Sequence, residues 1–104
     1  MLLLLAALVV APMQDTDTTF AVRAGGRMNL DNFEGSVRIT TWNRAAVRVQ
    51  ATHDDDTRVE VENRGSGVWI RGRARHGPAE VDYRITVPAD MSLEVSAHDG
   101  DVQI

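Results

Sequence analysis

Along most of this chain, apolar and polar residues alternate with a period of two. The alternation starts near Phe20 and continues to Ile104, and no window carries the apolar stripe of an amphipathic helix. A period of two puts every second side chain on the same face of a β-strand, so that one face is buried and the other is wet. Residues typical of turns interrupt the alternation about every ten residues. The sequence therefore predicts an all-β chain of roughly eight or nine short strands.

The pattern Met-x-Leu, followed by Gly-x-Val-x-Ile, occurs in residues 28–39 and again in residues 91–104. The second copy is two residues longer between its Leu and its Gly, and we expect such a change of length at a turn rather than within a paired strand. We interpret the copies as a short-strand repeat that forms a β-solenoid or β-helix-like stack with antiparallel hairpins. Because the second copy ends on the apolar Ile104, we expect an array that was cut or continues elsewhere.

Residues 1–11 form an uninterrupted apolar run, and polar residues occupy positions 14–19. The run is shorter than the roughly 20 residues that span a bilayer, but it fits the apolar region of a secretory signal. It departs from that pattern because no Lys or Arg precedes it, and a buried strand or short helix is the alternative. We expect residues 1–19 to be a signal-like segment and polar linker, and residues 20–104 to be a β-repeat domain that is incomplete at its C-terminus.

The composition excludes several classes of site. The chain has 104 residues and a formal net charge of −4, and its Arg residues are interspersed with Asp and Glu, which is unlike the basic patch of a nucleic-acid-binding protein. It contains no Cys, so disulfides, thiolate metal sites, cysteine nucleophiles and a lipid-modified cysteine are excluded. Every basic residue other than His is Arg.

Two acidic turns resemble calcium sites superficially. Residues 53–56 read His-Asp-Asp-Asp and residues 98–101 read His-Asp-Gly-Asp. The first lacks the Asp-x-Asp-x-Asp-Gly spacing and distal Glu that surround one calcium ion, so we interpret it as a solvated hairpin turn. The second lacks a nonapeptide repeat, and Gly100 is better explained by a turn that needs a positive φ.

No signature of an active site emerges from the sequence. No Ser lies in a nucleophile elbow, and among so many outward acids a carboxylate pair suited to glycoside chemistry is expected by chance. His53, His76 and His98 lie in separate predicted turns, which disfavours a shared metal site. We therefore assign no catalytic, cofactor-binding or metal residues and predict that the protein is not an enzyme.

The two tryptophans are candidate binding residues. Trp42 follows a predicted strand at a corner, and alternation places Trp69 on an outer face, where it could stack on a sugar or anchor a partner. The structural interpretation, which we favour, has Trp69 covering a sheet edge or the stems of Arg71 or Arg84. On the same outer faces we expect charge pairs across strands, which join Arg58, Glu60 and Glu62 to Arg71 and Arg84.

Four segments in order resemble a known family: residues 30–42, residues 47–51, the Val-Asp-Tyr-Arg-Ile-Thr-Val-Pro block at 81–88, and the Leu-Glu-Val to Gly-Asp-Val-Gln-Ile segment at 93–104. They are similar to the bacterial adhesin-like domain, an extracytoplasmic β-repeat family of unknown function, over most of residues 20–104. The resemblance implies a β-solenoid that continues with further Gly-Asp-Val repeats, of which this chain is a truncated copy. It transfers no catalytic residues.

The leading hypothesis is an exported, non-enzymatic interaction module of the cell envelope or surface, located in the periplasm, in the envelope or outside the cell. Its expected ligand is an envelope component, a carbohydrate or a protein, and it contacts the membrane only through the N-terminal segment. The chain could also associate with itself through the C-terminal edge strand, residues 102–104. The alternatives are a fragment of a carbohydrate-active β-helix enzyme and an extracytoplasmic sensor or regulatory domain.

Overall fold

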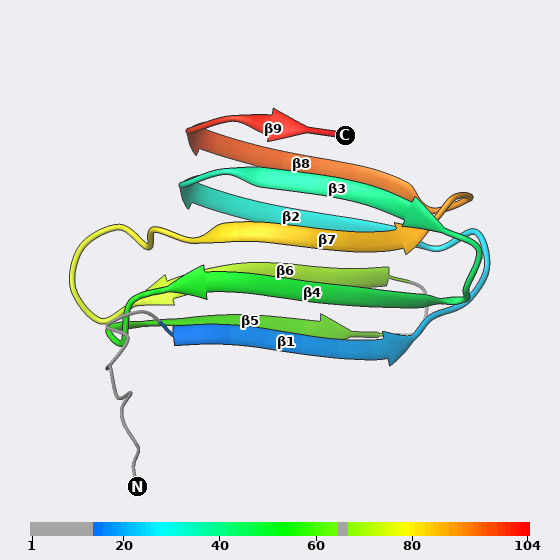
Figure 1. The fold of residues 1–104 in the computed structure, drawn as a ribbon, viewed down its shortest axis with the longest axis horizontal. Helices are drawn as coiled ribbons and strands as arrows, with labels where there is room; N and C mark the ends of the chain where they lie inside the picture. Colours follow the sequence, from blue (N-terminus) through cyan, green and yellow to red (C-terminus); the bar gives the residue numbers. More distant parts are fainter. Residues whose placement is uncertain (1–13, 65–66) are drawn as a thin grey trace, which may run out of the picture.

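The computed structural model describes residues 14–64 and 67–104, and within these ranges it contains nine β-strands and no helix (Figure 1). The all-β class and the expected number of strands are confirmed. The strands are β1 (Gln14–Ala21), β2 (Arg27–Glu34), β3 (Val37–Trp42), β4 (Ala46–His53), β5 (Thr57–Asn63), β6 (Gly67–Ala74), β7 (Asp82–Pro88), β8 (Ser92–Asp99) and β9 (Val102–Gln103).

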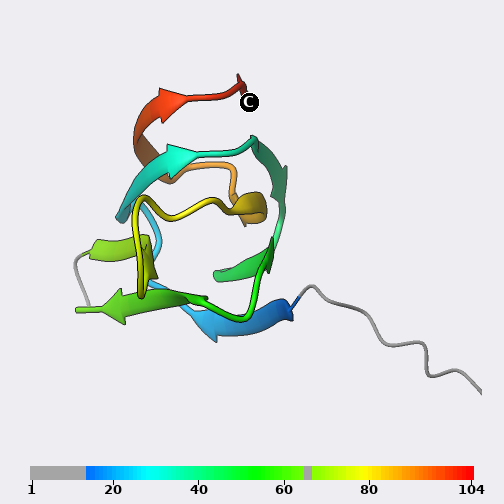
Figure 2. The same ribbon diagram turned by 90° about the vertical axis from the view of Figure 1, so that its left-hand side faces the viewer.

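The strands form two open sheets that face one another (Figure 2). One sheet has the order β1-β4-β7-β3-β9 and the other has the order β5-β6-β2-β8. Both are mixed: β1, β4 and β7 pair antiparallel, as do β5 and β6, whereas β7-β3-β9 and β6-β2-β8 pair parallel. The expected β-solenoid is thus not supported, because local alternation fixes which face of a strand is buried but not which strands become neighbours.

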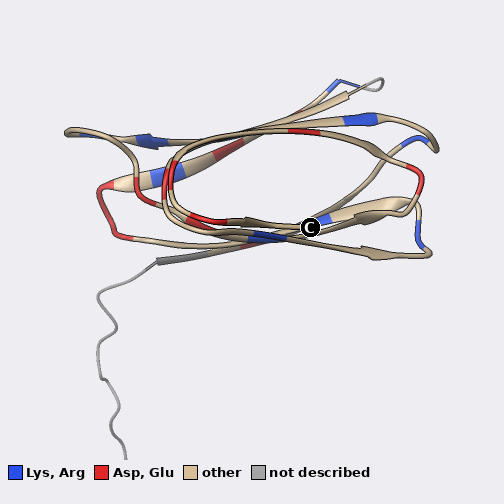
Figure 3. Ribbon diagram, turned by 90° about the horizontal axis from the view of Figure 1, so that it is seen from above, with Lys and Arg blue, Asp and Glu red and all other residues tan. Residues whose placement is uncertain are grey.

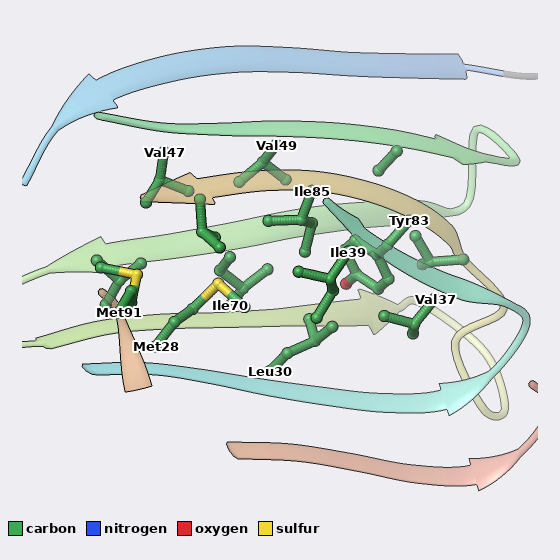
Figure 4. Close-up of a cluster of buried hydrophobic side chains, with 14 residues drawn as sticks. Met28, Leu30, Val37, Ile39, Val47, Val49, Ile70, Tyr83, Ile85 and Met91 are labelled. Atoms are coloured by element: carbon green, nitrogen blue, oxygen red, sulfur yellow. The ribbon is translucent and has the colours of Figure 1, made fainter. Parts of the chain in front are cut away.

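The inward side chains of both sheets meet in one apolar core (Figure 4). Met28, Leu30 and Ile70 come from the four-stranded sheet, and Val49 and Ile85 come from the five-stranded sheet; all are at most 2% exposed. Burial of each such side chain contributes about 1.5–3 kcal/mol. The core occupies period-two positions, as the alternation predicted for most of the chain. The same alternation placed Val102 and Ile104 inward, which is wrong: they are 40% and 78% exposed, at the end of the sheet.

Three segments of the chain pass from the four-stranded to the five-stranded sheet at the same end of the molecule, on the left of Figure 1. They are β6 to β7, β2 to β3, and β8 to β9, and we call the turns between these strands the corners. The corners bond to one another through their backbones. The Val81 N–H donates to the Glu34 carbonyl (3.0 Å between N and O), and the Gly35 N–H donates to the Asp99 carbonyl (3.1 Å).

The two copies of the sequence pattern lie side by side and parallel. Their Gly-x-Val parts pair with one another, but their Met-x-Leu parts are shifted by two residues. Gly100 lies against Gly35 and Val102 pairs with Val37, whereas Met28 pairs with Leu93 rather than with Met91. The two extra residues therefore lie along β8, and their expected location at the turn was wrong. An even shift preserves which side chains face inward, so the strand accommodates it.

Strand β1 begins earlier than the domain boundary expected at residue 20. Residues 14–19, expected to be linker, lie in β1 and pair with β4. The predicted signal run at residues 1–11 lies outside the described residues. Within the described ranges, no helix has the length and apolar character needed to cross a membrane.

The corner glycines provide a test of this packing. Gly35 has φ +111°, and a Cβ placed on it would overlap the Val81 carbonyl oxygen; Gly77 also has positive φ (+70°), but a Cβ there meets open space. We expect Gly77→Ala to lower the free energy of unfolding by about 1 kcal/mol, from backbone strain alone. Gly35→Ala should cost about 3 kcal/mol or more, because the corner must also shift. Urea denaturation of both variants measures the difference, and equal losses would show that the corners do not pack this closely.

Candidate functional site

The acidic turn at residues 53–56 has a structural role. His53 is buried at the end of β4, and its Nδ1 lies 2.9 Å from the Asp54 carbonyl oxygen. Because a carbonyl only accepts, Nδ1 carries the proton, and Nε2 accepts from the Thr16 hydroxyl at 2.9 Å. The Asp54 carboxylate accepts from the Asp56 N–H at 3.1 Å, as in an Asx-turn. These contacts support a turn, but the expected hairpin is wrong, because the turn joins β4 of the five-stranded sheet to β5 of the four-stranded sheet.

The other predicted turn site is only partly a turn: His98 and Asp99 end β8, and the corner begins at Gly100. Gly100 has φ +134°, which confirms the positive φ expected there, and the His98 ring packs on Phe33 with centroids 4.8 Å apart. His76 lies in the segment between β6 and β7, where its Nδ1 is 3.4 Å from Asp56. Within the described part of the chain, no group of three or more His, Asp or Glu side chains is arranged to hold a metal ion.

Both tryptophans are covered by arginines. Trp42 donates from Nε1 to the Ala46 carbonyl (2.8 Å), and the Arg44 guanidinium lies 4.6 Å from the centre of its ring. Trp69 is 39% exposed, which confirms its outward position, and it borders a hollow of about 290 Å³. Arg64, rather than Arg71 or Arg84, lies over its ring at 5.1 Å. One face of Trp69 is thus already occupied by a cation–π contact.

The outer face of the four-stranded sheet is charge-balanced around Glu60. Its carboxylate accepts from Arg71 and Arg73, each at 3.1 Å, and lies 3.3 Å from Arg58. Partial desolvation opposes ionisation, but the hydrogen bonds from Arg71 and Arg73 outweigh it, so the pKa of Glu60 lies below its ordinary value. The expected pairing with Arg71 is confirmed. The expected pairing with Arg84 is wrong, because Arg84 lies in β7 of the other sheet.

The outer face of the five-stranded sheet carries a row of directly opposed residues that we call the arginine row: Asp17, Gln50, Arg84, Arg38 and Gln103. All five line a hollow of about 680 Å³. The row places the two exposed guanidinium groups on adjacent parallel strands, and like charges directly opposite one another are destabilising.

Two of the three carboxylates that line the hollow are engaged by other groups. Asp82 accepts from the Ser36 N–H at 2.9 Å and from its hydroxyl at 3.1 Å, and Asp17 pairs with Arg48 at 2.8 Å. Hydrogen bonds from Arg48 lower the pKa of Asp17 despite partial desolvation. Among the residues that the structure describes, neither Arg38 nor Arg84 has an ion-pair partner. The hollow therefore combines the unpaired guanidinium groups of Arg38 and Arg84 with the Asp101 carboxylate, which also lines it.

The edges of the two sheets differ in their exposed apolar side chains. Both ends carry charges, which protect an edge against unwanted pairing: β5 has Glu60 and Glu62, and β8 has Glu94 and Asp99. At the end opposite to β5, β8 and β9 are the last strands of their sheets, and we call them together the β8–β9 edge. There Val102 is 40% exposed and Ile104 is 78% exposed. Figure 3 looks down on this end.

Tyr83 is a buried residue whose special character the sequence did not reveal. It was expected only as one inward position of an alternating strand. Its ring is 2% exposed, and its hydroxyl has no hydrogen-bond partner among the described residues. Burial, and secondarily the negative charge of Asp31, raise the pKa of its phenol far above the ordinary value of 10.0. The arginine row was missed for a related reason, because it exists only once the strand pairing is known.

No protein family, curated protein or solved structure in the comparisons matches this chain. The resemblance to the bacterial adhesin-like domain stays a prediction.

The buried phenol predicts an alkaline instability. As pH rises, the unfolded chain ionises Tyr83 first, because its pKa is lower there. The free energy of unfolding should be intact below about pH 10 and fall by about 1.4 kcal/mol per pH unit above it. The chain has one Tyr and no Lys, so Tyr83→Phe should remove this slope. At neutral pH the same variant should be neutral or more stable by about 1 kcal/mol, because it removes an unpaired hydroxyl. Urea denaturation between about pH 8 and about pH 11 measures both effects, and equal slopes in the two proteins would contradict them.

Proposed function

We propose that this chain is an exported, non-enzymatic module that binds another macromolecule at the cell envelope through the β8–β9 edge. The observation that carries the proposal is the apolar exposure at the edge formed by β8 and β9. Among the described residues these strands end their sheets, and Val102 and Ile104 are exposed there. Both ends of the molecule carry charge, with Arg58, Glu60 and Glu62 in β5 and Glu94 and Asp99 in β8, so exposed apolar side chains are what distinguish the β8–β9 edge. An exposed sheet edge is a template for an added strand. The apolar run at residues 1–11 supplies the reason to expect export.

We propose a protein segment, rather than a small molecule, as the partner of the β8–β9 edge. Sheet edges bind through backbone hydrogen bonds, with pockets for alternate side chains adding specificity. Leu93 and Val95 of β8 are half-buried and pack against the core, so an added strand would complete the burial of side chains that are already oriented inward. This apolar contribution would stabilise the complex at about 25 cal/mol per Å² of buried apolar surface, before the cost of ordering the partner.

Fractionation of cells that express the chain tests export and binding together. The full chain should appear in the envelope fraction, and a variant lacking residues 1–12 should stay in the cytoplasm. Val102→Lys with Ile104→Lys should still be exported but should be released from the envelope, because the lysines oppose strand addition. The control, Asn43→Lys with Ala45→Lys, adds the same charge at exposed positions in the turn between β3 and β4 and should be retained. Cytoplasmic location of both the full and the shortened chain would contradict export.

A second candidate function is binding of an acidic polysaccharide in the hollow over the arginine row. It is favoured by the unpaired Arg38 and Arg84 and by the flanking amides of Gln50 and Gln103. Guanidinium groups bind carboxylates through paired, charge-assisted hydrogen bonds, and the amides can bond sugar hydroxyls. This candidate corresponds to the carbohydrate ligand expected from sequence, without catalysis.

Binding of polygalacturonate to the folded protein tests this second candidate. Arg38→Gln with Arg84→Gln should weaken binding by about tenfold or more, since each charge-assisted hydrogen bond is worth about 1.5–3 kcal/mol. Arg23→Gln with Arg27→Gln makes the same change of net charge elsewhere on the surface and should leave affinity within about twofold. Calorimetry at two salt concentrations measures both pairs. Equal weakening by the two pairs would mean that only net charge matters.

A further inference from the structure

The Trp69 ring is held in place by its own strand and by the end of β5. A Cβ on Gly67 would lie 2.9 Å from two carbons of the Trp69 ring, so the ring lies over Gly67 and depends on the absence of a side chain there. The Arg64 guanidinium lies 5.1 Å from the ring centre and also donates to both Glu62 carboxylate oxygens, each at 3.2 Å. These contacts restrict the ring before any ligand arrives, and such preorganisation lowers the entropic cost of binding.

A small hollow adjoins the Trp69 ring on the outer face of the four-stranded sheet. Arg64 follows β5, on one side of β6, whereas the hollow extends over β2 and β8, on the opposite side. Trp69 is 39% exposed, so part of its ring surface is accessible to a ligand. The hollow measures about 290 Å³, which is at the lower limit of the roughly 300–1,000 Å³ of ligand pockets. It therefore suits a single small ring rather than a large molecule.

The polar lining of the hollow mixes hydrogen-bond donors and acceptors. Two rows of directly opposed side chains form it: Trp69, Asn29 and Glu94 in one row, and Arg71, Asp31 and Ser96 in the next. Asp31 and Glu94 are exposed, and neither has an ion-pair partner within the described ranges. Their carboxylates accept hydrogen bonds, whereas the Asn29 amide and the Ser96 hydroxyl both donate and accept. The Arg71 guanidinium is held by Glu60 at 3.1 Å and offsets part of the negative charge.

This lining fits the hydroxyl groups of a neutral ligand better than a charged group. A hydroxyl both donates and accepts, so neighbouring hydroxyls on one ring can use the carboxylates as acceptors and the Asn29 amide as a donor. An anion would be repelled by Asp31 and Glu94. A cation would meet Arg71 and an aromatic ring whose quadrupole already attracts Arg64. The apolar C–H face of a pyranose, in contrast, matches the apolar ring surface of a tryptophan.

We propose that this hollow binds one pyranose ring of a neutral glycan. The C–H face of the sugar packs on Trp69, and its hydroxyls bond to Asp31, Glu94 and Asn29. The site uses side chains on the outer face of the four-stranded sheet, whereas the arginine row lies on the five-stranded sheet. It also uses none of the backbone groups at the β8–β9 edge, so it is independent of both functions proposed above.

Nuclear magnetic resonance titration of the full chain with neutral trisaccharides tests the site. The probes are cellotriose, laminaritriose and triacetylchitotriose, and at least one should bind with a Kd of about 1 mM or tighter. The sugar should shift the indole N–H resonance of Trp69 and leave that of Trp42 in place, because Trp42 lies in β3 of the other sheet. Added salt should change the Kd by less than about twofold, because screening acts between charges and the sugar has none.

Paired variants locate the binding. Trp69→Ala should weaken binding by about tenfold or more. Phe33→Ala is its matched control and should stay within about twofold, since Phe33 is 45% exposed on the same sheet face but does not line the hollow. Glu94→Gln should weaken binding by about fivefold or more, because it removes a charged acceptor. Asp55→Asn removes the same charge at an exposed turn position and should leave the Kd unchanged. Unfolding midpoints report whether each variant is folded.

Three outcomes would overturn the proposal. They are failure of all three trisaccharides to bind at millimolar concentration, equal weakening by Trp69→Ala and Phe33→Ala, and resonance shifts that appear at Trp42 rather than at Trp69. Trp69-dependent binding of polygalacturonate without binding of any neutral sugar would also reject the neutral ligand. Envelope retention and the effect of Arg38→Gln with Arg84→Gln depend on other residues, so failure of this site leaves both proposed functions standing.

Discussion

The hydrogen bonds between stacked corners determine the arrangement of everything else in this fold. When Val81 donates to Glu34 and Gly35 donates to Asp99, the strands on both sides of each corner are placed in register together. A slip of one residue at a corner would turn the inward side chains of both adjoining strands outward. The shared core of Met28, Leu30, Val37 and Ile39 therefore depends on the corners as much as on hydrophobicity. Close approach of the carbonyls, in turn, depends on glycine.

The same register organises the surface. On the four-stranded sheet it brings Glu60 of β5 beside Arg71 and Arg73 of β6, and the charges balance. On the five-stranded sheet it brings Arg38 opposite Arg84, while Asp82 and Asp17 are held by other donors. Exposed ion pairs contribute about 0–1 kcal/mol each, so neither arrangement decides stability. The difference between the two faces concerns what each can bind.

Sequence reasoning succeeded where the cause is local. The period of two identified the all-β class, most of the inward residues and the exposed Trp69, and turn chemistry identified the positive φ of Gly100. It failed where the answer depends on which strands become neighbours. Arg84 was matched with Glu60 across a boundary between sheets, and the extra residues of the second pattern were placed at a turn instead of along β8. The sequence could not predict that the Tyr83 hydroxyl lacks a hydrogen-bond partner among the described residues, because position 83 follows the same alternation as every other inward residue.

An open sheet edge usually endangers a protein, because its backbone groups can pair with any extended chain. In this fold β8 and β9 form two such edges, which are joined by a corner at Gly100. A Cβ on Gly100 would overlap the Gly35 carbonyl oxygen, just as a Cβ on Gly35 would overlap the Val81 carbonyl oxygen. The close contact that fixes the register of the fold therefore also restricts the outer residue of each contact to glycine.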